Sequence, residues 1–409
     1  MEFRNLTPFD ALCFSALDIE GDEYPVIVAK VGYRLVLGDK PGELIAKVMD
    51  AEPISLCMGD EYWGETGRSS VKRESDLAPF KPKCDVIING NAYAPNGEAA
   101  QQWAAKLKVS DAEQTRLEKV VKISGPSQFE PQLLAGWSRS NPLPVSTVPL
   151  RWEYAFGGAS LVPDPNNPTQ PPWLNEVCFT NPLGCGWREA RYKSLAKKAE
   201  LDVDGIIKAP QIEASDSSIH QPDIARHPSG ALAAPEMATV AANYAHSPVG
   251  LGVVGRAWTP RIQCAGTYDA GWLAQRHPLS PNDLDTHYWN GAPEDQQIDY
   301  PSPNVALALW NLAPVQYTSQ GYCQVQLPGH RPFLLLRMED GALYPCPMLT
   351  DTIIVDTDTM QIELTHRISF SAELAVRVVE LRFETDPDAP LLSFEADSQT
   401  HMPKHTAKT

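Results

Sequence analysis

The chain has 409 residues, of which 51 are acidic and 34 are basic, and its formal net charge is −17. A hydrophobic content of 43% is sufficient for a folded core and excludes disorder along the whole chain. The negative charge repels nucleic-acid phosphates and the longest basic clusters are short, so no nucleic-acid partner is predicted. Thirty-seven prolines interrupt most windows that could hold a long helix, which favours strands joined by turns.

The first third of the chain predicts strands. Residues 26–35 alternate between apolar and polar side chains, which indicates a strand buried on one face only. Residues 44–49 are expected to form its neighbour across a turn at 39–42. Residues 84–88 predict a further strand, which the Asn-Gly-Asn sequence at 89–91 ends.

Residues 98–121 allow two interpretations. The Ala- and Gln-rich start of the stretch has helix propensity. From Trp103 to Val109, however, apolar side chains alternate with polar or small ones, which is typical of a strand. We therefore expect two strands here, joined by a connector at 110–116.

The middle of the chain is rich in turn-forming residues. Residues 141–187 are dense in Pro, Gly and Asn and indicate a long structured loop region. Tryptophans that require burial lie in this region: Trp152, Trp173 and Trp187. Residues 188–201 are the best helix candidate, and the weakly patterned residues 202–247 are interpreted as a variable insertion.

Strand patterns return in the last third. Residues 305–310 form a short apolar element, and four strands are expected at 333–338, 352–355, 361–364 and 375–383. Turn residues at 340–341 and 356–358 mark two hairpin tips.

Together these elements predict a mainly β protein: two interlocked β-rich subdomains with long Pro/Gly-rich structured loops and few short helices. The expected parts are an N-terminal β-rich subdomain, a loop-rich connector with the variable insertion, a C-terminal β-rich subdomain and a polar, flexible tail: 1–140, 141–248, 249–385 and 386–409.

A cytoplasmic location is expected. The chain start lacks a basic segment followed by an apolar run, and no stretch is apolar for about 18 residues, so neither a signal peptide nor a membrane segment is predicted. Eight cysteines are scattered singly without a C-x-x-C pair, which predicts reduced thiols rather than disulfides or a zinc site.

Residues with catalytic or cofactor chemistry are sparse in the sequence. Cys264 precedes His277 and His287, which are the residue types of a nucleophilic site, but a buried thiol beside surface imidazoles is the commoner arrangement. Residues 250–255 spell G-x-G-x-x-G without a preceding strand, which favours a loop over a dinucleotide site. Neither a metal nor a cofactor is predicted.

Six carboxylates between residues 269 and 299 leave an enzymatic alternative open: Asp269, Asp283, Asp285, Glu294, Asp295 and Asp299. They lie near aromatic residues, and carboxylates flanked by aromatics are typical of a carbohydrate-active hydrolase. Aspartates in these Pro-Asn-Asp and Gly-Thr-Tyr-Asp contexts also cap turns, which needs no catalysis.

Ordered motifs across most of the chain resemble one family. They lie at residues 5–9, 26–30, 81–86, 149–158, 181–186, 266–272, 276–278, 292–297, 327–329 and 349–352. They are similar to a bacterial domain-of-unknown-function family encoded beside type VI secretion spike genes. Residues 188–247 match this pattern poorly.

The resemblance implies an adaptor or chaperone that has no enzymatic activity. Such a protein holds a secreted effector toxin in the cytosol and helps load it onto the spike complex, near a PAAR-like protein at its tip. A structural component of the spike assembly is a further alternative. Because they match the family pattern poorly, residues 188–247 are the segment expected to encode the choice of partner.

The aromatic and arginine-rich stretch 256–289 is the expected partner-binding region, because Trp, Tyr and Arg are enriched at interface hot spots. The candidate residues are Arg256, Trp258, Tyr268, Trp272, Arg276, Tyr288 and Trp289. The same residue types also fill protein cores, and the sequence leaves that alternative open.

Overall fold

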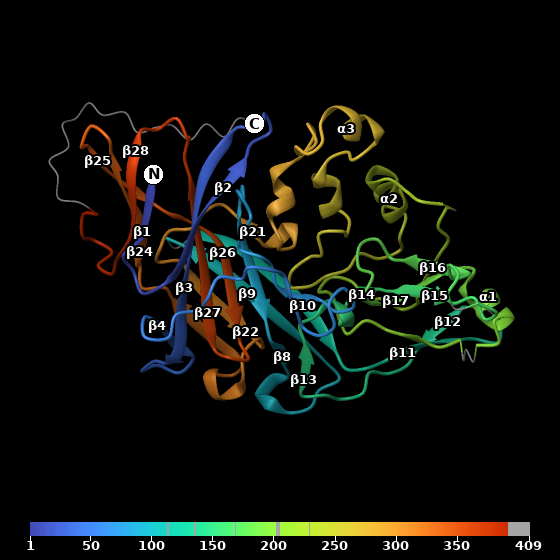
Figure 1. The fold of residues 1–409 in the computed structure, drawn as a ribbon. Coiled ribbons are helices and arrows are strands. Elements are labelled where there is room, and N and C mark those ends of the chain that lie inside the picture. The colour runs from blue at the N-terminus through green and yellow to red at the C-terminus, as the bar shows by residue number, and fades with distance from the viewer. Residues whose placement is uncertain (113, 135, 168, 202–204, 229, 392–409) are drawn as a thin grey trace.

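The computed structural model describes residues 1–391 except 113, 135, 168, 202–204 and 229. The protein is mainly β, as predicted. Figure 1 shows a large curled sheet in the centre, a smaller sheet beside it and a loop-rich lobe on the opposite side. Of the expected tail, residues 386–391 are described, and the remainder lies outside the described residues.

The large sheet combines strands from both ends of the sequence. Within this sheet, most neighbouring strands among the described residues are antiparallel, and two pairs are parallel. Its order is β19 (Ile212–Ala214), β10 (Gln114–Ser124), β9 (Gln102–Asp111), β22 (Ala306–Trp310), β23 (Tyr322–Gln326), β4 (Glu43–Val48), β3 (Glu23–Leu37), β27 (Gln361–Ser369), β26 (Leu349–Asp356), β7 (Cys84–Asn89) and β21 (Gln297–Ile298), with β2 (Asp10–Leu17) paired to β3.

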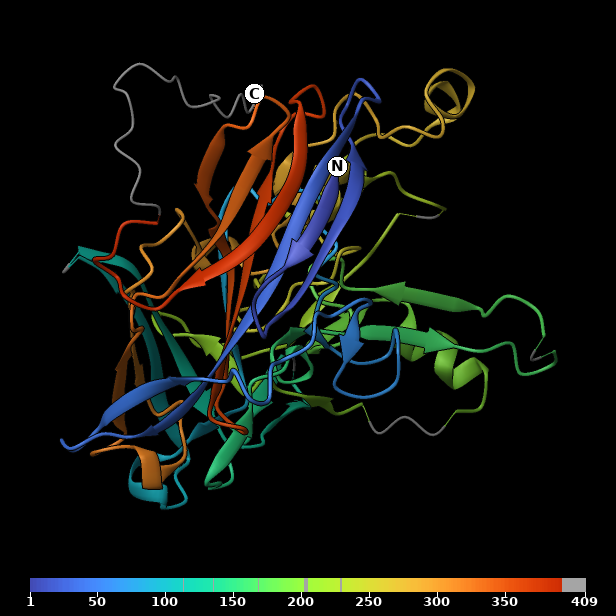
Figure 2. The ribbon, with the colours of Figure 1, turned by 60° about the vertical axis from the view of Figure 1, so that its left-hand side comes forward.

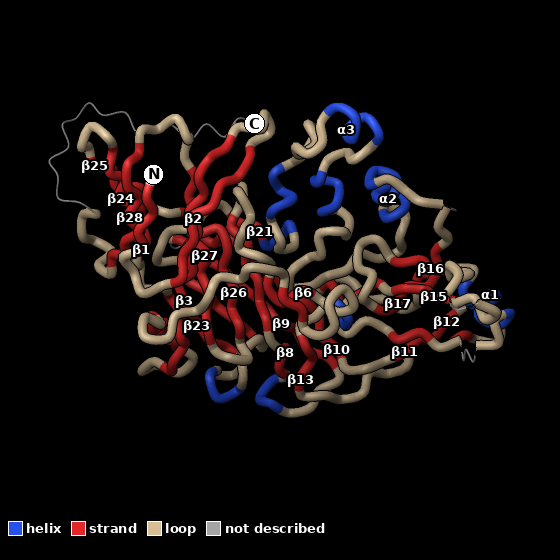
Figure 3. The backbone as a smooth tube through the Cα atoms, in the orientation of Figure 1, coloured by secondary structure: helices blue, strands red, loops and turns tan. Residues whose placement is uncertain are grey.

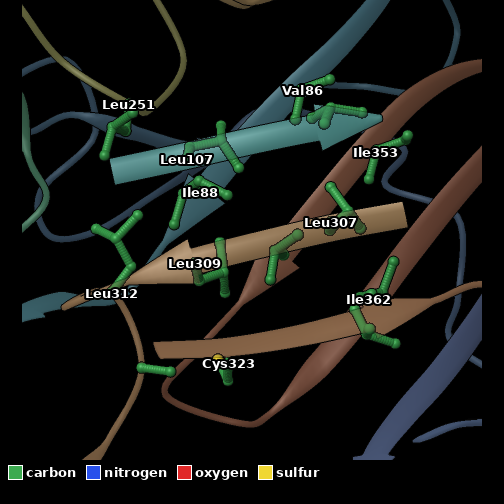
Figure 4. Packing of buried hydrophobic residues seen from close by; sticks show 14 of the residues in the cluster. Val86, Ile88, Leu107, Leu251, Leu307, Leu309, Leu312, Cys323, Ile353 and Ile362 are labelled. Atoms are coloured by element: carbon green, nitrogen blue, oxygen red, sulfur yellow. The ribbon is translucent and has the colours of Figure 1, made fainter. Parts of the chain in front are cut away.

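The main core fills the inside of this curl. Alternate residues of β9 and β22 point inward, so that Leu107 and Leu309 are paired across the strands and meet side chains from β7, β26 and β27 (Figure 4). The strand interpretation of 98–121 is therefore confirmed, and the connector is shorter than expected because β9 ends at Asp111 and β10 begins at Gln114.

The smaller sheet covers the beginning of β3. It contains β1 (Glu2–Asn5), β28 (Val376–Glu384), β24 (Arg331–Met338) and β25 (Leu343–Pro347). Ile27 and Ala29 of β3 pack into the core beneath this sheet, whereas Val31, Tyr33 and Leu35 on the same face enter the main core. One long strand thus contributes to both cores.

The expectation that β3 is buried on one face only is wrong. Its supposedly solvent-facing Lys30 is 1% exposed, and the Lys30 Nζ lies 2.7 Å from Asp76 Oδ2 and 3.5 Å from Glu363 Oε2. The segment that carries Asp76 covers the outer face of the strand, and paired carboxylates make the buried ammonium tolerable there. This segment includes the ribbon of β5 (Glu61–Tyr62) and β6 (Val71–Arg73).

The strand predictions for the last third of the chain are largely confirmed. The strands expected at 333–338, 352–355, 361–364 and 375–383 correspond to β24, β26, β27 and β28, and both expected turns join paired strands. Strand β25 escaped prediction because its prolines, Pro345 and Pro347, are typical strand breakers. They are accommodated because β25 is an edge strand.

The loop-rich lobe contains short strands and has its own core around Phe129, Phe156 and Trp187. Its strands are β11 (Gln128–Pro131), β12 (Trp137–Arg139) and β18 (Ile207–Lys208), then β14 (Phe156–Gly157), β17 (Cys185–Glu189) and β20 (Asp223–Ala225), and the pair β15 (Ala159–Val162) and β16 (Leu174–Val177). The ribbon β8 (Asn91–Tyr93) and β13 (Thr147–Pro149) leads into it.

The helix expected at 188–201 is shorter in the structure. Residues up to Glu189 pair as β17 with neighbouring strands, so the helix α1 covers only Tyr192–Lys198. The weakly patterned residues 202–247 contribute β18, β19, β20 and the helix α2 (Ala234–Ala241). The third helix of the described residues, α3 (Ala270–Gln275), lies on a projecting loop.

Candidate partner-binding surface

Two of the motifs that carry the resemblance, 149–158 and 181–186, meet the segment 250–258 inside the molecule. We call this site the tryptophan junction: Trp152, Asn181, Gly250, Gly255 and Trp258. The Trp152 indole Nε1 donates a 2.6 Å hydrogen bond to the Val253 carbonyl, and the Asn181 amide donates to the Trp152 carbonyl at 2.8 Å. A Cβ at Gly250 would lie 2.8 Å from the Trp152 ring. The glycines of the G-x-G-x-x-G sequence therefore make room for indole rings, in a loop as expected.

Two of the predicted interface residues belong to this buried region. The Trp258 ring packs edge-on against Trp152, with 5.7 Å between the centroids. The Arg256 guanidinium pairs with Glu74 at 3.0 Å and Asp60 at 3.3 Å. Arg256 and Trp258 are partly buried. Arg256 holds its segment against the segment that covers β3, and Trp258 holds it against Trp152.

Tyr288 and Trp289 are also partly buried. The Arg261 guanidinium lies over the Tyr288 ring, 5.7 Å from its centroid, and the Arg261 Nε donates a 2.9 Å hydrogen bond to the Tyr288 carbonyl. The Trp289 ring contacts the Tyr288 ring edge-on, with 5.5 Å between the ring centroids. Arg261 also pairs with Glu74 at 2.7 Å, so the two ends of the stretch are joined to the segment that covers β3.

Tyr268, Trp272 and Arg276 lie on a loop that projects from the body, over residues 266–285 and with α3 at its outer end (Figures 1 and 2). Figure 3 shows that this part of the molecule consists of short helices and loops rather than strands. The Thr267 backbone N–H and hydroxyl donate to the two oxygens of Asp283 at 2.9 and 2.7 Å, which closes the base of the loop. These hydrogen bonds lower the pKa of Asp283.

Trp272 holds the loop together from within. Its backbone N–H donates to Asp269 at 2.8 Å and its indole Nε1 donates to the Leu279 carbonyl at 2.9 Å. Its ring lies between Tyr268 and His277, with centroid distances of 4.7 and 5.2 Å. Trp272 is therefore an internal support of the loop, whereas Tyr268 is 59% exposed.

The projecting loop contacts the tip of the β2–β3 hairpin. The Arg276 guanidinium donates to the Ser280 carbonyl at 2.7 Å and also to the Ile19 carbonyl across the two elements. A Cβ at Gly21 would lie 3.1 Å from the Leu279 side chain. Figure 2 shows the hairpin tip beside the loop that leads to α3. Arg276 thus joins two elements that are 257 residues apart.

Apolar side chains remain exposed on both elements: Leu17 at 52%, Ile19 at 37%, Tyr268 at 59% and Leu273 at 64%. Exposed carboxylates accompany them: Glu20, Asp22, Glu23, Asp269, Asp283 and Asp285. We call these ten residues the hairpin–loop surface. Of the four apolar residues, only Tyr268 was among the predicted interface residues; Leu17, Ile19 and Leu273 were not. The sequence signal for the hairpin tip was the presence of two apolar residues, Leu17 and Ile19, at the acidic turn of residues 18–23.

Five of the six carboxylates of the hydrolase alternative have a hydrogen-bond or ion-pair partner, as Asp283 has in Thr267. Asp269 and Asp285 accept hydrogen bonds from backbone N–H groups that begin short helices, at 2.8 and 2.9 Å. Asp295 and Asp299 pair with Lys119 and Lys83, and Glu294 begins a 3₁₀ turn. These contacts are those of turn caps and ion pairs.

The thiol of Cys264 does not resemble an activated nucleophile. Burial and the nearby Asp285 carboxylate raise the pKa of Cys264, whereas nucleophilic cysteines have a lowered pKa. His277 packs against Trp272, and His287 Nδ1 lies 2.7 Å from Asp285 Oδ1. In the described part of the chain, no group of three or more His, Cys, Asp or Glu side chains is arranged to hold a metal ion.

Comparison with known proteins identifies one family. No curated protein and no solved structure matches the chain. Among the described residues, no helix has the length and apolar character needed to span a membrane. A family model matches residues 20–367, which include both the tryptophan junction and the projecting loop. Because this match covers well over half of the chain, the protein belongs to the DUF2169 family, an uncharacterized protein family conserved in bacteria.

Proposed function

We propose that the protein is a cytosolic adaptor that binds a type VI secretion effector and helps load it onto the spike complex, near a PAAR-like tip. The order of the motifs along the chain, which resembles such adaptors, supports this function. All eight cysteines are free thiols, which fits a reducing compartment.

The observation that carries the proposal is the exposure of Tyr268 and Leu273 on an internally bonded loop. Exposed apolar side chains that cluster on a well-defined element mark sites of protein interaction. An adaptor needs such a surface and needs no catalytic geometry. The hairpin–loop surface is therefore the proposed docking site for the effector.

Co-purification tests this function. The full chain would be tagged and co-expressed with the products of its neighbouring genes, among which the proposal expects a toxin, a spike protein and a PAAR-like protein. We expect the toxin to co-elute with the chain and to gain soluble yield from co-expression. Failure of every neighbouring product to co-elute, together with unchanged toxin solubility, would contradict the adaptor function.

Two alternatives give different results in the same experiments. A structural component of the spike would be secreted together with it, whereas an adaptor stays in the producing cell. A hydrolase would cleave glycans, and Asp269→Asn, Asp285→Asn or Glu294→Gln would abolish the cleavage. Either result would replace the proposed function.

A further inference from the structure

The charge of the hairpin–loop surface limits what can bind there. Residues 17–23 and 266–289 together contain seven carboxylates and one arginine, which gives a formal charge of −6 with neutral histidines. Within the described residues no salt bridge involves Glu20, Asp22 or Glu23. Elsewhere many carboxylates have a cationic partner, as Asp76 and Glu213 do.

The one arginine of these segments, Arg276, offsets only one of the seven carboxylate charges, and its guanidinium is already engaged between the loop and the hairpin. Its Nε and Nη2 groups donate to backbone carbonyls of Ser280 and Ile19, so its role is to hold the loop against the hairpin. The exposed leucine, isoleucine and tyrosine side chains thus lie on two segments in which carboxylates outnumber the single arginine by seven to one. A surface with an excess of one charge attracts a partner of the opposite charge and repels one of the same charge.

We propose that the hairpin–loop surface binds a cationic amphipathic segment of the effector, with apolar side chains against Leu17, Ile19, Tyr268 and Leu273 and lysines or arginines against the surrounding carboxylates. This inference rests on the proposed function for the identity of the partner. The chemistry follows from the surface itself, because anionic membranes and nucleic acids are repelled by the same carboxylates.

A synthetic peptide tests the chemistry without the effector. The probe is an amphipathic peptide of only leucine and lysine, about four helical turns long, and its control carries glutamate in place of every lysine. Binding of the labelled peptides to the full chain would be measured by fluorescence anisotropy. We expect the lysine peptide to bind, the glutamate peptide not to bind, and the affinity to fall as salt is raised.

Variants locate the binding site. Tyr268→Ala and Leu273→Ala are each expected to weaken lysine-peptide binding about tenfold or more, with unchanged melting temperature. The triple variant Glu20→Gln, Asp22→Asn, Glu23→Gln is expected to weaken binding and to reduce its salt dependence. The matched control is Leu133→Ala, since Leu133 is a fully exposed leucine of the β11–β12 turn outside this surface.

The outcomes separate the inference from the proposed function. Equal binding of both peptides, no binding, or equal losses in Leu133→Ala and Leu273→Ala would overturn the inference. So would effector co-purification that is unchanged by Tyr268→Ala and Leu273→Ala, although the adaptor function would then stand. Peptide binding that follows the expected pattern, without any effector co-purifying, would support the chemistry of the surface and remove the adaptor function.

Discussion

The tryptophan junction and the projecting loop, residues 266–285, have similar residue types but opposite surroundings. Both place tryptophan beside glycines: Trp152 and Trp258 lie against Gly250 and Gly255, and Trp272 follows Gly271. In the junction, the Trp152 indole bonds to a carbonyl 101 residues away and the side chain is 5% exposed. In the projecting loop, the Trp272 indole bonds to a carbonyl 7 residues away, and the neighbouring Tyr268 and Leu273 face solvent.

This comparison shows what residue type alone does not reveal. An aromatic side chain becomes part of the core when distant segments cover it, and it becomes available to a partner when its support is local. Arg256 and Arg276 illustrate the same point, because both were predicted as interface anchors and both are engaged in holding segments together. Exposure, rather than composition, therefore selects Tyr268 and Leu273 as candidate contacts.

The largest expected effect is on the junction. Trp152→Ala removes a buried indole that packs on Gly250 and Trp258, and should lower the free energy of unfolding by about 3–5 kcal/mol. Tyr268→Ala, on the projecting loop, should change it by no more than about 0.5 kcal/mol. Urea unfolding of the two variants measures both values, and similar losses would remove the distinction between the regions.

Buried and exposed carboxylates should differ in the same way in their contribution to stability. Asp76→Asn removes the nearest counter-charge of the buried Lys30 and should cost about 3–5 kcal/mol of stability, because an ammonium then remains buried with weaker compensation. Glu20→Gln, at the exposed hairpin tip, should leave stability nearly unchanged. An Asp76→Asn protein as stable as the parent would show that Glu363 alone supports Lys30.

The pH dependence of stability provides a third comparison between a buried group and an exposed one. Burial lowers the pKa of His366 to about 3, and only its Nδ1 has a partner, the Thr350 hydroxyl at 3.1 Å. The unfolded chain binds this proton below pH ~6.5 whereas the folded protein does not, so stability is complete above that pH and falls on acidification. We expect a loss of about 2 kcal/mol between pH 7 and 5 from this residue.

Matched histidine variants assign that pH effect. His366→Gln should flatten the dependence of unfolding free energy on pH between about 6.5 and 4, because the titrating group is gone. His277→Gln, which changes an exposed ring of the projecting loop, should leave the slope as it is in the parent. A parent slope retained in His366→Gln would assign the acid sensitivity to other groups.

The smallest expected stability effect is that of Leu273→Ser. Its side chain is 64% exposed, so the melting temperature should change by less than about 1 °C. Binding to the effector should nevertheless fall, since the surface loses an apolar contact. Differential scanning calorimetry beside the co-purification assay measures both, and a large loss of stability would place Leu273 in the structure of the loop rather than at an interface.

Most strands could be predicted from the sequence because the patterns that indicate them involve only neighbouring residues. Alternation from Trp103 to Val109 placed β9, and the turns at 340–341 and 356–358 placed two hairpins, since period two and turn chemistry need only neighbouring residues. The two-sided burial of β3 did not follow, because Lys30 becomes a core residue only through Asp76 and Glu363, which are distant in the chain. The prolines of β25 similarly concealed a strand at a sheet edge.

By itself, the sequence determined a mainly β chain, its hairpin turns and the region, 256–289, in which interface residue types are concentrated. The tertiary structure alone decided which of those residues are covered. Trp258 meets Trp152 and Arg256 meets Glu74 because the fold brings their segments together, while nothing in the described chain covers Leu273. Burial depends on contacts between segments that are far apart in sequence, and no local pattern specifies those contacts.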